Sequence, residues 1–283
     1  MKTVAVVGLG EMGLPMARNL AARGFEVRGY DVRPAAVAAL ADGGGHAAAS
    51  AGDAAGGADA VVVMVRTPAQ AEEVVLADGG VLARMRRDAV LIVMSTVGVS
   101  CMRRLGEAAR ARGVAFLDAP VSGGRAGAEE GTLTVIVGGE AAALSRARPV
   151  LEAVGSRIAH VGEVGAGTAV KMANQVLLAT SLLAAREVAA LAASAGVPVE
   201  RAWDVIRTCT GTTWVVEHWP VASAWIQHDA PGSALGILVK DTGLALDLAR
   251  AEGVPAPLLG LVSQMIAALA HGARKPVSDA FET

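Results

Sequence analysis

Residues 3–24 read TVAVVGLGEMGLPMARNLAARG, and this stretch decides the fold. An apolar, β-type run at residues 3–7 leads directly into a glycine-rich turn and then into a helical pattern. Strand, glycine turn and helix in this order are typical of a dinucleotide-binding α/β fold. The first glycine would allow the tight turn, the second would let a pyrophosphate approach the backbone, and the third would let the helix pack closely on the strand. The predicted phosphate-binding turn comprises Gly8, Leu9, Gly10, Glu11, Met12 and Gly13.

A second strand-like run, Glu26 to Tyr30, supports this interpretation because it ends at Asp31. An acidic residue about 20 positions after the glycine turn commonly binds the adenine ribose of the cofactor. A carboxylate there would repel a 2′-phosphate, so the sequence favours NAD over NADP. Arg33 keeps NADP possible, since a guanidinium can pair with that phosphate. The alternative is that Asp31 only caps a helix beginning near Pro34.

Two further runs, residues 58–65 and 89–94, are apolar throughout, as expected for parallel strands covered on both faces. In such sheets the segments that follow the strands line the cofactor crevice. Thr96 has a second interpretation, as the cap of the next helix. The predicted crevice residues are Val65, Arg66 and Thr67 after the first run, and Ser95 and Thr96 after the second.

A strand at residues 114–117 runs into the sequence DAPVSGG, residues 118–124. The backbone amides of Ser122, Gly123 and Gly124, with the serine hydroxyl, suit a carboxylate. An ordinary glycine turn is the alternative. A strand at 132–137 and a helix at 140–151 would complete a dinucleotide-binding domain over residues 1–162.

Residues 165–197 predict one long apolar helix whose first charged residue is Lys171. Asn174 and Gln175 lie three and four positions further on, so an amine and two amides share one helix face. The alternative is a core helix whose lysine reaches back to water. Because the helix joins two predicted domains, a ligand site is favoured. Further helical patterns at 199–208, 214–227, 234–251 and 257–271 predict an all-helical second domain over residues 163–283.

Composition excludes several classes of protein. With 283 residues, 53% hydrophobic and 18% charged, the chain has the size and apolar content for two folded domains. A net charge of −2 without a basic cluster argues against nucleic acid. Cys101 and Cys209 have no CxxC partner, which predicts free thiols and no metal site. We expect a cytoplasmic protein without a membrane span, because prolines and polar residues interrupt the apolar run Gly253 to Ala273.

Five motifs together resemble the 3-hydroxyacid dehydrogenase family, which includes 3-hydroxyisobutyrate dehydrogenase and tartronate semialdehyde reductase. In chain order they are GLGEMGLPMARNL, MSTV, DAPVSGG with GTLTVIVGG, GAGTAVKMANQ and VKDTGLALD. The resemblance covers nearly the whole chain. It implies a Rossmann domain with a doubly wound, mostly parallel sheet, followed by an all-helical domain joined to it by the long helix.

The resemblance also implies roles for individual residues. Lys171 would be the catalytic lysine and Asn174 its polar companion. Ser122, Gly123 and Gly124 would hold the substrate carboxylate, while Thr96 and Lys240 would reach the cofactor or the substrate. Arg66-Thr67 departs from the family pattern of Pro followed by Asn or Ser. Gln175 fits the tartronate semialdehyde branch and Trp214 the hydroxyisobutyrate branch, so both substrates stay open.

We therefore expect hydride transfer between NAD, or NADP, and a small hydroxy acid, with Lys171 as general acid and base. A free lysine titrates near pH 10.4. Burial and the second cation, Lys240, are expected to lower the pKa of Lys171. The alternatives are an imine reductase on the same fold, against which the lysine argues, and a non-catalytic dinucleotide-sensing module. A homodimer or homotetramer is expected, since the long helix often packs against a partner subunit in this family.

Overall fold

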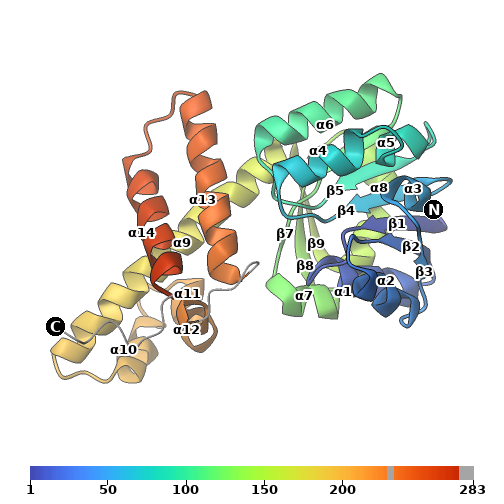
Figure 1. Ribbon diagram of the computed structural model, residues 1–283. Coiled ribbons are helices and arrows are strands. Elements are labelled where there is room, and N and C mark those ends of the chain that lie inside the picture. The colour runs from blue at the N-terminus through green and yellow to red at the C-terminus, as the bar shows by residue number, and fades with distance from the viewer. Residues whose placement is uncertain (228–232, 274–283) are drawn as a thin grey trace. The chain divides into compact units, whose positions relative to one another are not determined.

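The computed structural model describes residues 1–227 and 233–273 (Figure 1). Among these residues, strand β1 (Thr3–Val7) lies in the middle of a nine-stranded sheet. The other strands are β2 (Glu26–Tyr30), β3 (His46–Ala47), β4 (Ala60–Val63), β5 (Val90–Val93), β6 (Ala115–Asp118), β7 (Val121–Ser122), β8 (Leu133–Gly139) and β9 (Gly155–Gly162). Their order is β3-β2-β1-β4-β5-β6-β8-β7, with β9 paired to β8. Strands β1 to β6 are parallel, and β8 runs antiparallel to β6 and β7. The strand order reverses beside β1, where open α/β sheets bind ligands.

Helices cover both faces of this sheet. Val4 and Val6 of β1 face one layer and Ala5 and Val7 the other, which explains why the strands are apolar throughout. The fold class predicted from the sequence is thus confirmed for this unit. The first layer contains α1 (Gly13–Ala22), α2 (Pro34–Ala41), α7 (Gly124–Glu130) and α8 (Ala141–Val154); the second contains α3 (Ala51–Ala55), α4 (Pro68–Leu76), α5 (Val81–Arg84) and α6 (Val99–Ala111).

The remainder of the described chain is helical, as predicted. Helix α9 (Ala166–Ser194) contributes Leu182 to a small core that also includes Trp203, Leu235 and Ile266. The chain divides into two compact units, Met1–Lys171 and Met172–Thr283, so the division falls inside α9. We propose that the domains comprise residues 1–162 and 163–283. The helices of the second unit are α10 (Val199–Ile206), α11 (Trp214–Glu217), α12 (Trp219–Gln227), α13 (Ala234–Ala251) and α14 (Pro257–Ala273).

Some expectations about the elements were wrong. Strands β3, β7 and β9 were not predicted, because two of them contain only two residues and β9 is largely exposed. The helix expected over 214–227 is two helices, α11 and α12, separated at His218. Pro220 near the start of α12 has no N–H group, so a helix cannot continue through it with all its hydrogen bonds.

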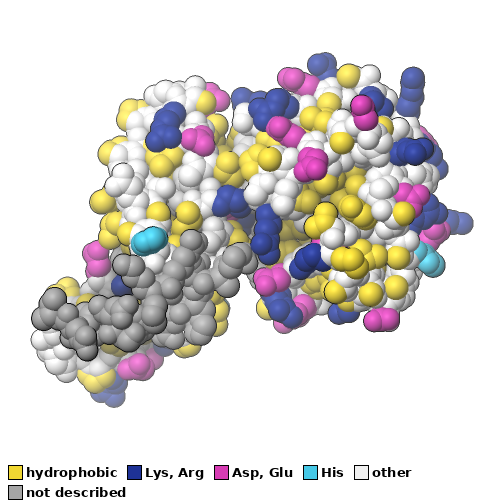
Figure 2. Space-filling model, viewed as in Figure 1, with side chains coloured by type: hydrophobic (Ala, Val, Ile, Leu, Met, Phe, Trp, Pro, Cys, Tyr) yellow, Lys and Arg dark blue, Asp and Glu magenta, His cyan; other side chains and the backbone are white. Residues whose placement is uncertain are grey.

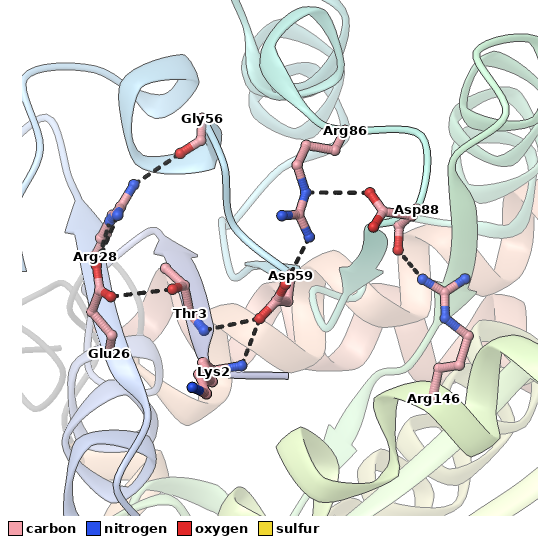
Figure 3. Close-up of polar contacts among 9 residues, drawn as sticks. All are labelled: Lys2, Thr3, Glu26, Arg28, Gly56, Asp59, Arg86, Asp88 and Arg146. Carbon is pink, nitrogen blue, oxygen red and sulfur yellow. Dashed lines mark hydrogen bonds and ion pairs between the residues drawn. The ribbon is translucent and has the colours of Figure 1, made fainter.

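A polar cluster lies at the amino ends of the parallel strands, at the end of the sheet away from the glycine turn (Figure 3). The Asp59 carboxylate accepts hydrogen bonds from the backbone N–H groups of Lys2 and Thr3, at 2.5 and 3.1 Å, and from Arg86 at 2.7 Å. The Lys2 bond contributes most to the lowered pKa of Asp59, and burial opposes it. This cluster ties β1 to the segment before β4, away from the glycine turn.

Charged side chains of both signs are mixed on the face of the molecule that Figure 2 draws. On the face drawn in Figure 2, Lys and Arg side chains are interspersed with Asp and Glu rather than gathered into a basic patch. Within residues 1–227 and 233–273, no group of three or more His, Cys, Asp or Glu side chains is arranged to hold a metal ion. Cys101 is buried and Cys209 is exposed, and both are free thiols.

Helix α9 is long and apolar enough to cross a membrane by length and composition alone. Only 22% of its most apolar 18-residue window is buried. Core helices of soluble proteins pass the same test. The long apolar helix itself was predicted from the sequence, where only the run Gly253 to Ala273 was weighed as a membrane span.

Candidate functional site

The three glycines of the turn after β1 have different surroundings. A Cβ on Gly8 would lie 2.2 Å from the Met64 carbonyl oxygen, and one on Gly13 would lie 1.9 Å from that of Gly8. The fold itself therefore requires these two glycines, and Gly8 also has φ +95°. A Cβ on Gly10 would meet only the Arg33 guanidinium, at 3.9 Å. The open space above Gly10 fits the close approach of a dinucleotide pyrophosphate.

The start of helix α1 leaves its backbone donors without a side-chain cap. Its N-cap residue is Met12, and no side chain accepts a hydrogen bond there. Unpaired N–H groups and the positive end of the helix dipole attract phosphate. A cavity of about 370 Å³ adjoins this turn and is lined by Leu9, Gly10, Glu11, Leu14, Pro15, Arg18, Arg33, Ala35, Ala36, Arg125 and Glu129.

Asp31 holds the turn and Arg33 together. Its carboxylate accepts hydrogen bonds from the Leu9 N–H at 2.8 Å, the Arg33 N–H at 2.9 Å and the Arg33 guanidinium at 3.0 Å. Burial raises the pKa of Asp31, but the bonds from Arg33 and Leu9 outweigh it, so the pKa lies below the ordinary value. Asp31 does not cap α2, whose N-cap is Arg33. The guanidinium also donates to the Leu9 carbonyl oxygen at 3.1 Å, so Arg33 is already engaged.

The residues expected along the crevice lie just after β4 and β5. The buried Ser95 hydroxyl accepts a hydrogen bond from the Val65 N–H at 2.7 Å and donates to the Val63 carbonyl at 3.3 Å. Ser95 therefore ties the ends of the two strands together. Thr67 caps α4 in a reciprocal capping box with Gln70, and the Arg66 N–H also donates to Gln70. The suggestion that Thr96 caps α6 was wrong, because the N-cap of α6 is Gly98.

The predicted carboxylate site follows β6. Ser122 pairs with Thr134 of β8, and Gly123 and Gly124 have φ values of +129° and +63°. Two successive glycines at positive φ turn the chain sharply into α7, whose start has no side-chain cap. Successive backbone N–H groups in a turn of this kind can bind a small anion.

Asp118, the last residue of β6, is 0% exposed and holds the start of helix α9. One carboxylate oxygen accepts from the N–H groups of Gly165 and Thr168, each at 3.0 Å, and the other accepts from the Thr168 hydroxyl at 2.6 Å. Burial raises the pKa of Asp118, and these hydrogen bonds offset part of that effect. The carboxylate thus does for α9 what an N-cap side chain does for other helices.

Lys171 lies in the same part of the chain, three positions after Thr168 on α9. The residue is 8% exposed, which is unusual for a lysine. The expectation of a buried lysine on an apolar helix is met. Its polar neighbours on the helix, Asn174 and Gln175, follow one turn later.

Within the second unit, a partly buried polar network joins α9 to α13. Gln175 donates to one oxygen of Asp241 at 2.9 Å, and Lys240 donates to the other at 2.5 Å. Asn174 donates to the Gln175 side-chain oxygen at 3.3 Å. Asp241 is 1% exposed. Lys240, expected from the sequence to act as a second cation, thus forms an ion pair with the Asp241 carboxylate.

The aromatic side chains near residue 214 form two groups. Trp214 stacks on His218 and on Trp225, with ring centroids 4.5 and 5.6 Å apart. Trp219 instead packs against the buried Trp203 at 5.2 Å. Trp214 is 45% exposed, so only part of this cluster serves packing.

Sequence reasoning missed Asp118, Thr168 and Asp241 as site-supporting residues. Asp118 and Asp241 carried a signal, since each is a carboxylate at the end of, or within, an otherwise apolar segment. Thr168 carried none. Its partner is 50 positions away along the chain.

Comparisons with known proteins agree with this geometry. Residues 3–162 match the NAD binding domain of 6-phosphogluconate dehydrogenase, and residues 165–280 match the family described as NAD-binding of NADP-dependent 3-hydroxyisobutyrate dehydrogenase. An NAD-dependent L-serine dehydrogenase of Pseudomonas aeruginosa is 38% identical, with 91% of this chain and 89% of that protein covered. A 3-hydroxyisobutyrate dehydrogenase of the same organism is 37% identical, with 94% and 91% covered. The structure of Mycobacterium tuberculosis 3-hydroxyisobutyrate dehydrogenase with L-serine superposes with a TM-score of 0.86 at 35% identity, covering 97% of this chain and 100% of that one.

Proposed function

The chain belongs to the 3-hydroxyacid dehydrogenase family of NAD(P)-dependent oxidoreductases, and we propose that Lys171 is the general acid and base of its reaction. The observation that carries this proposal is a lysine only 8% exposed, on a helix whose first turn is held by a buried carboxylate. A lysine that merely reached back to water would not need such a setting.

In oxidation, neutral Lys171 accepts the proton of the substrate hydroxyl. At the same time, the carbon bonded to that hydroxyl loses a hydride and becomes a carbonyl carbon. In reduction, the Lys171 ammonium returns the proton to the same oxygen. When bound, the nicotinamide cofactor supplies the hydride acceptor or donor. The backbone of Ser122, Gly123 and Gly124 binds the substrate carboxylate, and Asn174 orients the amine or the substrate.

We infer that Asp241 fixes Lys240 and Gln175 in the second unit. A buried carboxylate shared by an ammonium and an amide leaves both donors with a defined direction. Lys240, which the family resemblance assigns to the cofactor or substrate, then acts from a charge-balanced pair.

The relatives support a proposal for the substrate class. L-Serine and 3-hydroxyisobutyrate both carry a primary hydroxyl on carbon 3 and a carboxylate, and we propose that this chain acts on a small acid of that kind. A panel of L-serine, 3-hydroxyisobutyrate, glycerate, 3-hydroxypropionate and the matching simple alcohols, assayed by cofactor absorbance, tests the proposal. We expect turnover only with carboxylates. Equal turnover of the alcohols would remove the role given to Ser122, Gly123 and Gly124, and cofactor binding without any turnover would favour a sensing module.

We further propose a soluble, cytoplasmic homodimer or homotetramer in which α9 contacts a second copy. Val170, Leu177, Ala184 and Leu191 recur every seven residues on α9, and all four are exposed. Apolar residues at this spacing form a stripe along one helix face, which is typical of helix pairing. The buried Gln175–Asp241 bond argues against burial of this helix in lipid.

A further inference from the structure

We propose that Asp118 is a positioning residue: through Thr168 it fixes the register and direction of the first turn of α9, and thereby the place of Lys171 relative to Ser122–Gly124. The inference rests on the proposed role of Lys171. It adds to that role a buried carboxylate and a threonine that act through the position of the lysine.

The first observation is the set of hydrogen bonds between Asp118 and the start of α9. The two carboxylate oxygens of Asp118 receive three hydrogen bonds from Gly165 and Thr168, and the group is fully buried. Each residue of an α-helix advances about 1.5 Å and turns about 100°. The hydrogen bonds to the Thr168 N–H and hydroxyl therefore set the direction in which the Lys171 side chain, three positions later, projects from the helix.

The second observation is the fit of the helix against the sheet. A Cβ on Gly167 would lie 2.5 Å from the Ile136 carbonyl oxygen and 2.7 Å from that of Asp118. A Cβ on Gly138 would lie 2.5 Å from the Glu163 carbonyl oxygen. The start of α9 thus lies directly on the backbone of β6 and β8, with no side chain between them to absorb a shift.

The third observation is the short connection between Asp118 and the proposed carboxylate site. Asp118 ends β6, and Ser122 follows it by four positions along the chain. The Ile136 N–H donates to the Pro120 carbonyl at 2.9 Å, so the connecting segment is fixed to the same strand that Gly167 contacts. The adjoining ends of β6 and β8 and the start of α9 therefore hold both the residues proposed to bind the carboxylate and the residue proposed to move the proton.

Thr168→Val tests the proposal because it nearly preserves shape while removing the hydroxyl that donates to Asp118. We expect kcat to fall about 10- to 100-fold, the effect of displacing a catalytic group by about 1 Å. The KM for NAD should not change, since the glycine turn is untouched. The rise of kcat with pH should persist at a lower plateau, because the lysine is still present. Thr168→Ser should recover most of the activity.

Ser50→Ala is the matched control. Ser50 caps α3 by accepting from the Asp53 N–H at 3.0 Å, and it lies outside the proposed site. It should lower the melting temperature and leave kcat unchanged. If Thr168→Val does not fold, Gly167→Ala gives the same test, because it displaces the helix start and keeps the carboxylate and hydroxyl.

The outcomes separate the two proposals. If Lys171→Ala abolishes activity while folded Thr168→Val, or Gly167→Ala in its place, keeps wild-type kcat, the positioning role is overturned and the role of Lys171 stands. If Lys171→Ala keeps wild-type kcat, both are overturned. Loss of kcat in Thr168→Val that Thr168→Ser does not restore would also contradict the inference.

Discussion

Gly10 and Gly13 stand three positions apart in the glycine turn, yet different requirements act on them. A Cβ at Gly13 would overlap the Gly8 carbonyl oxygen, whereas one at Gly10 would enter open space. We predict that Gly13→Ala lowers the free energy of unfolding by about 1–3 kcal/mol. Gly10→Ala should leave stability unchanged and weaken NAD binding. Denaturant unfolding and an NAD titration check this; equal NAD affinity in Gly10→Ala and wild type would place the pyrophosphate elsewhere.

We propose that Asp31 sets the cofactor preference, because it both presents a carboxylate and occupies the Arg33 guanidinium. Asp31→Ser should remove the repulsion and release Arg33. We expect the ratio of kcat/KM for NAD over NADP to fall about tenfold, which corresponds to about 1.4 kcal/mol. Glu26→Ser, at the other end of β2 and paired with Arg28, is the control and should not change the ratio. Wild-type enzyme that used both cofactors equally would mean that Arg33 overrides Asp31.

The buried Asp118 predicts a pH-dependent stability. Burial raises its pKa in the folded state above the ordinary value of about 3.9. As the pH rises, the unfolded chain loses this proton first, so the carboxyl costs stability from that value up to the folded-state pKa. The melting temperature of wild type relative to Asp118→Asn should therefore fall as the pH rises through this range. A relative rise would mean that the hydrogen bonds lower the pKa below that of the unfolded chain.

At the scale of elements, α9 is the helix on which the assembly proposal depends. Leu177 and Leu191 are 69% and 70% exposed, which is costly for leucine unless another surface covers them. Leu177→Lys with Leu191→Lys should shift the protein toward monomer in sedimentation at micromolar concentration. Leu76→Lys, at the end of α4 and 44% exposed, is the control and should not. A wild-type monomer would contradict the proposal.

The elements also divide by how well the sequence predicts them. The central parallel strands were predicted because both of their faces are buried, which makes them apolar throughout. Strand β9 was not, since Arg157, His160 and half of its other residues face solvent and the strand shows no apolar run. The glycine turn and Lys171 were identified from local spacing. The Asp118–Thr168 and Gln175–Asp241 contacts were not, because each joins residues at least 50 positions apart that only the fold brings together.

For the whole molecule, the family membership and the two-part architecture lead to one claim about chemistry. The glycine turn, Asp31 and the Ser122–Gly124 segment belong to the first unit, and Lys171 is its last residue. Asn174, Gln175, Lys240 and Asp241 belong to the second. The helix α9 is continuous from one set to the other. The proposed mechanism depends on Lys171, because it is the residue proposed to transfer the proton.

The most direct test is the pH dependence of kcat for Lys171→Ala beside wild type, with NAD affinity measured in parallel. We predict that kcat falls about 10²-fold or more, that its rise with pH disappears, and that NAD affinity is unchanged. Lys171→Arg should recover little, since a guanidinium does not act as a neutral base. A Lys171→Ala enzyme that keeps both its kcat and the rise with pH would assign proton transfer to another residue.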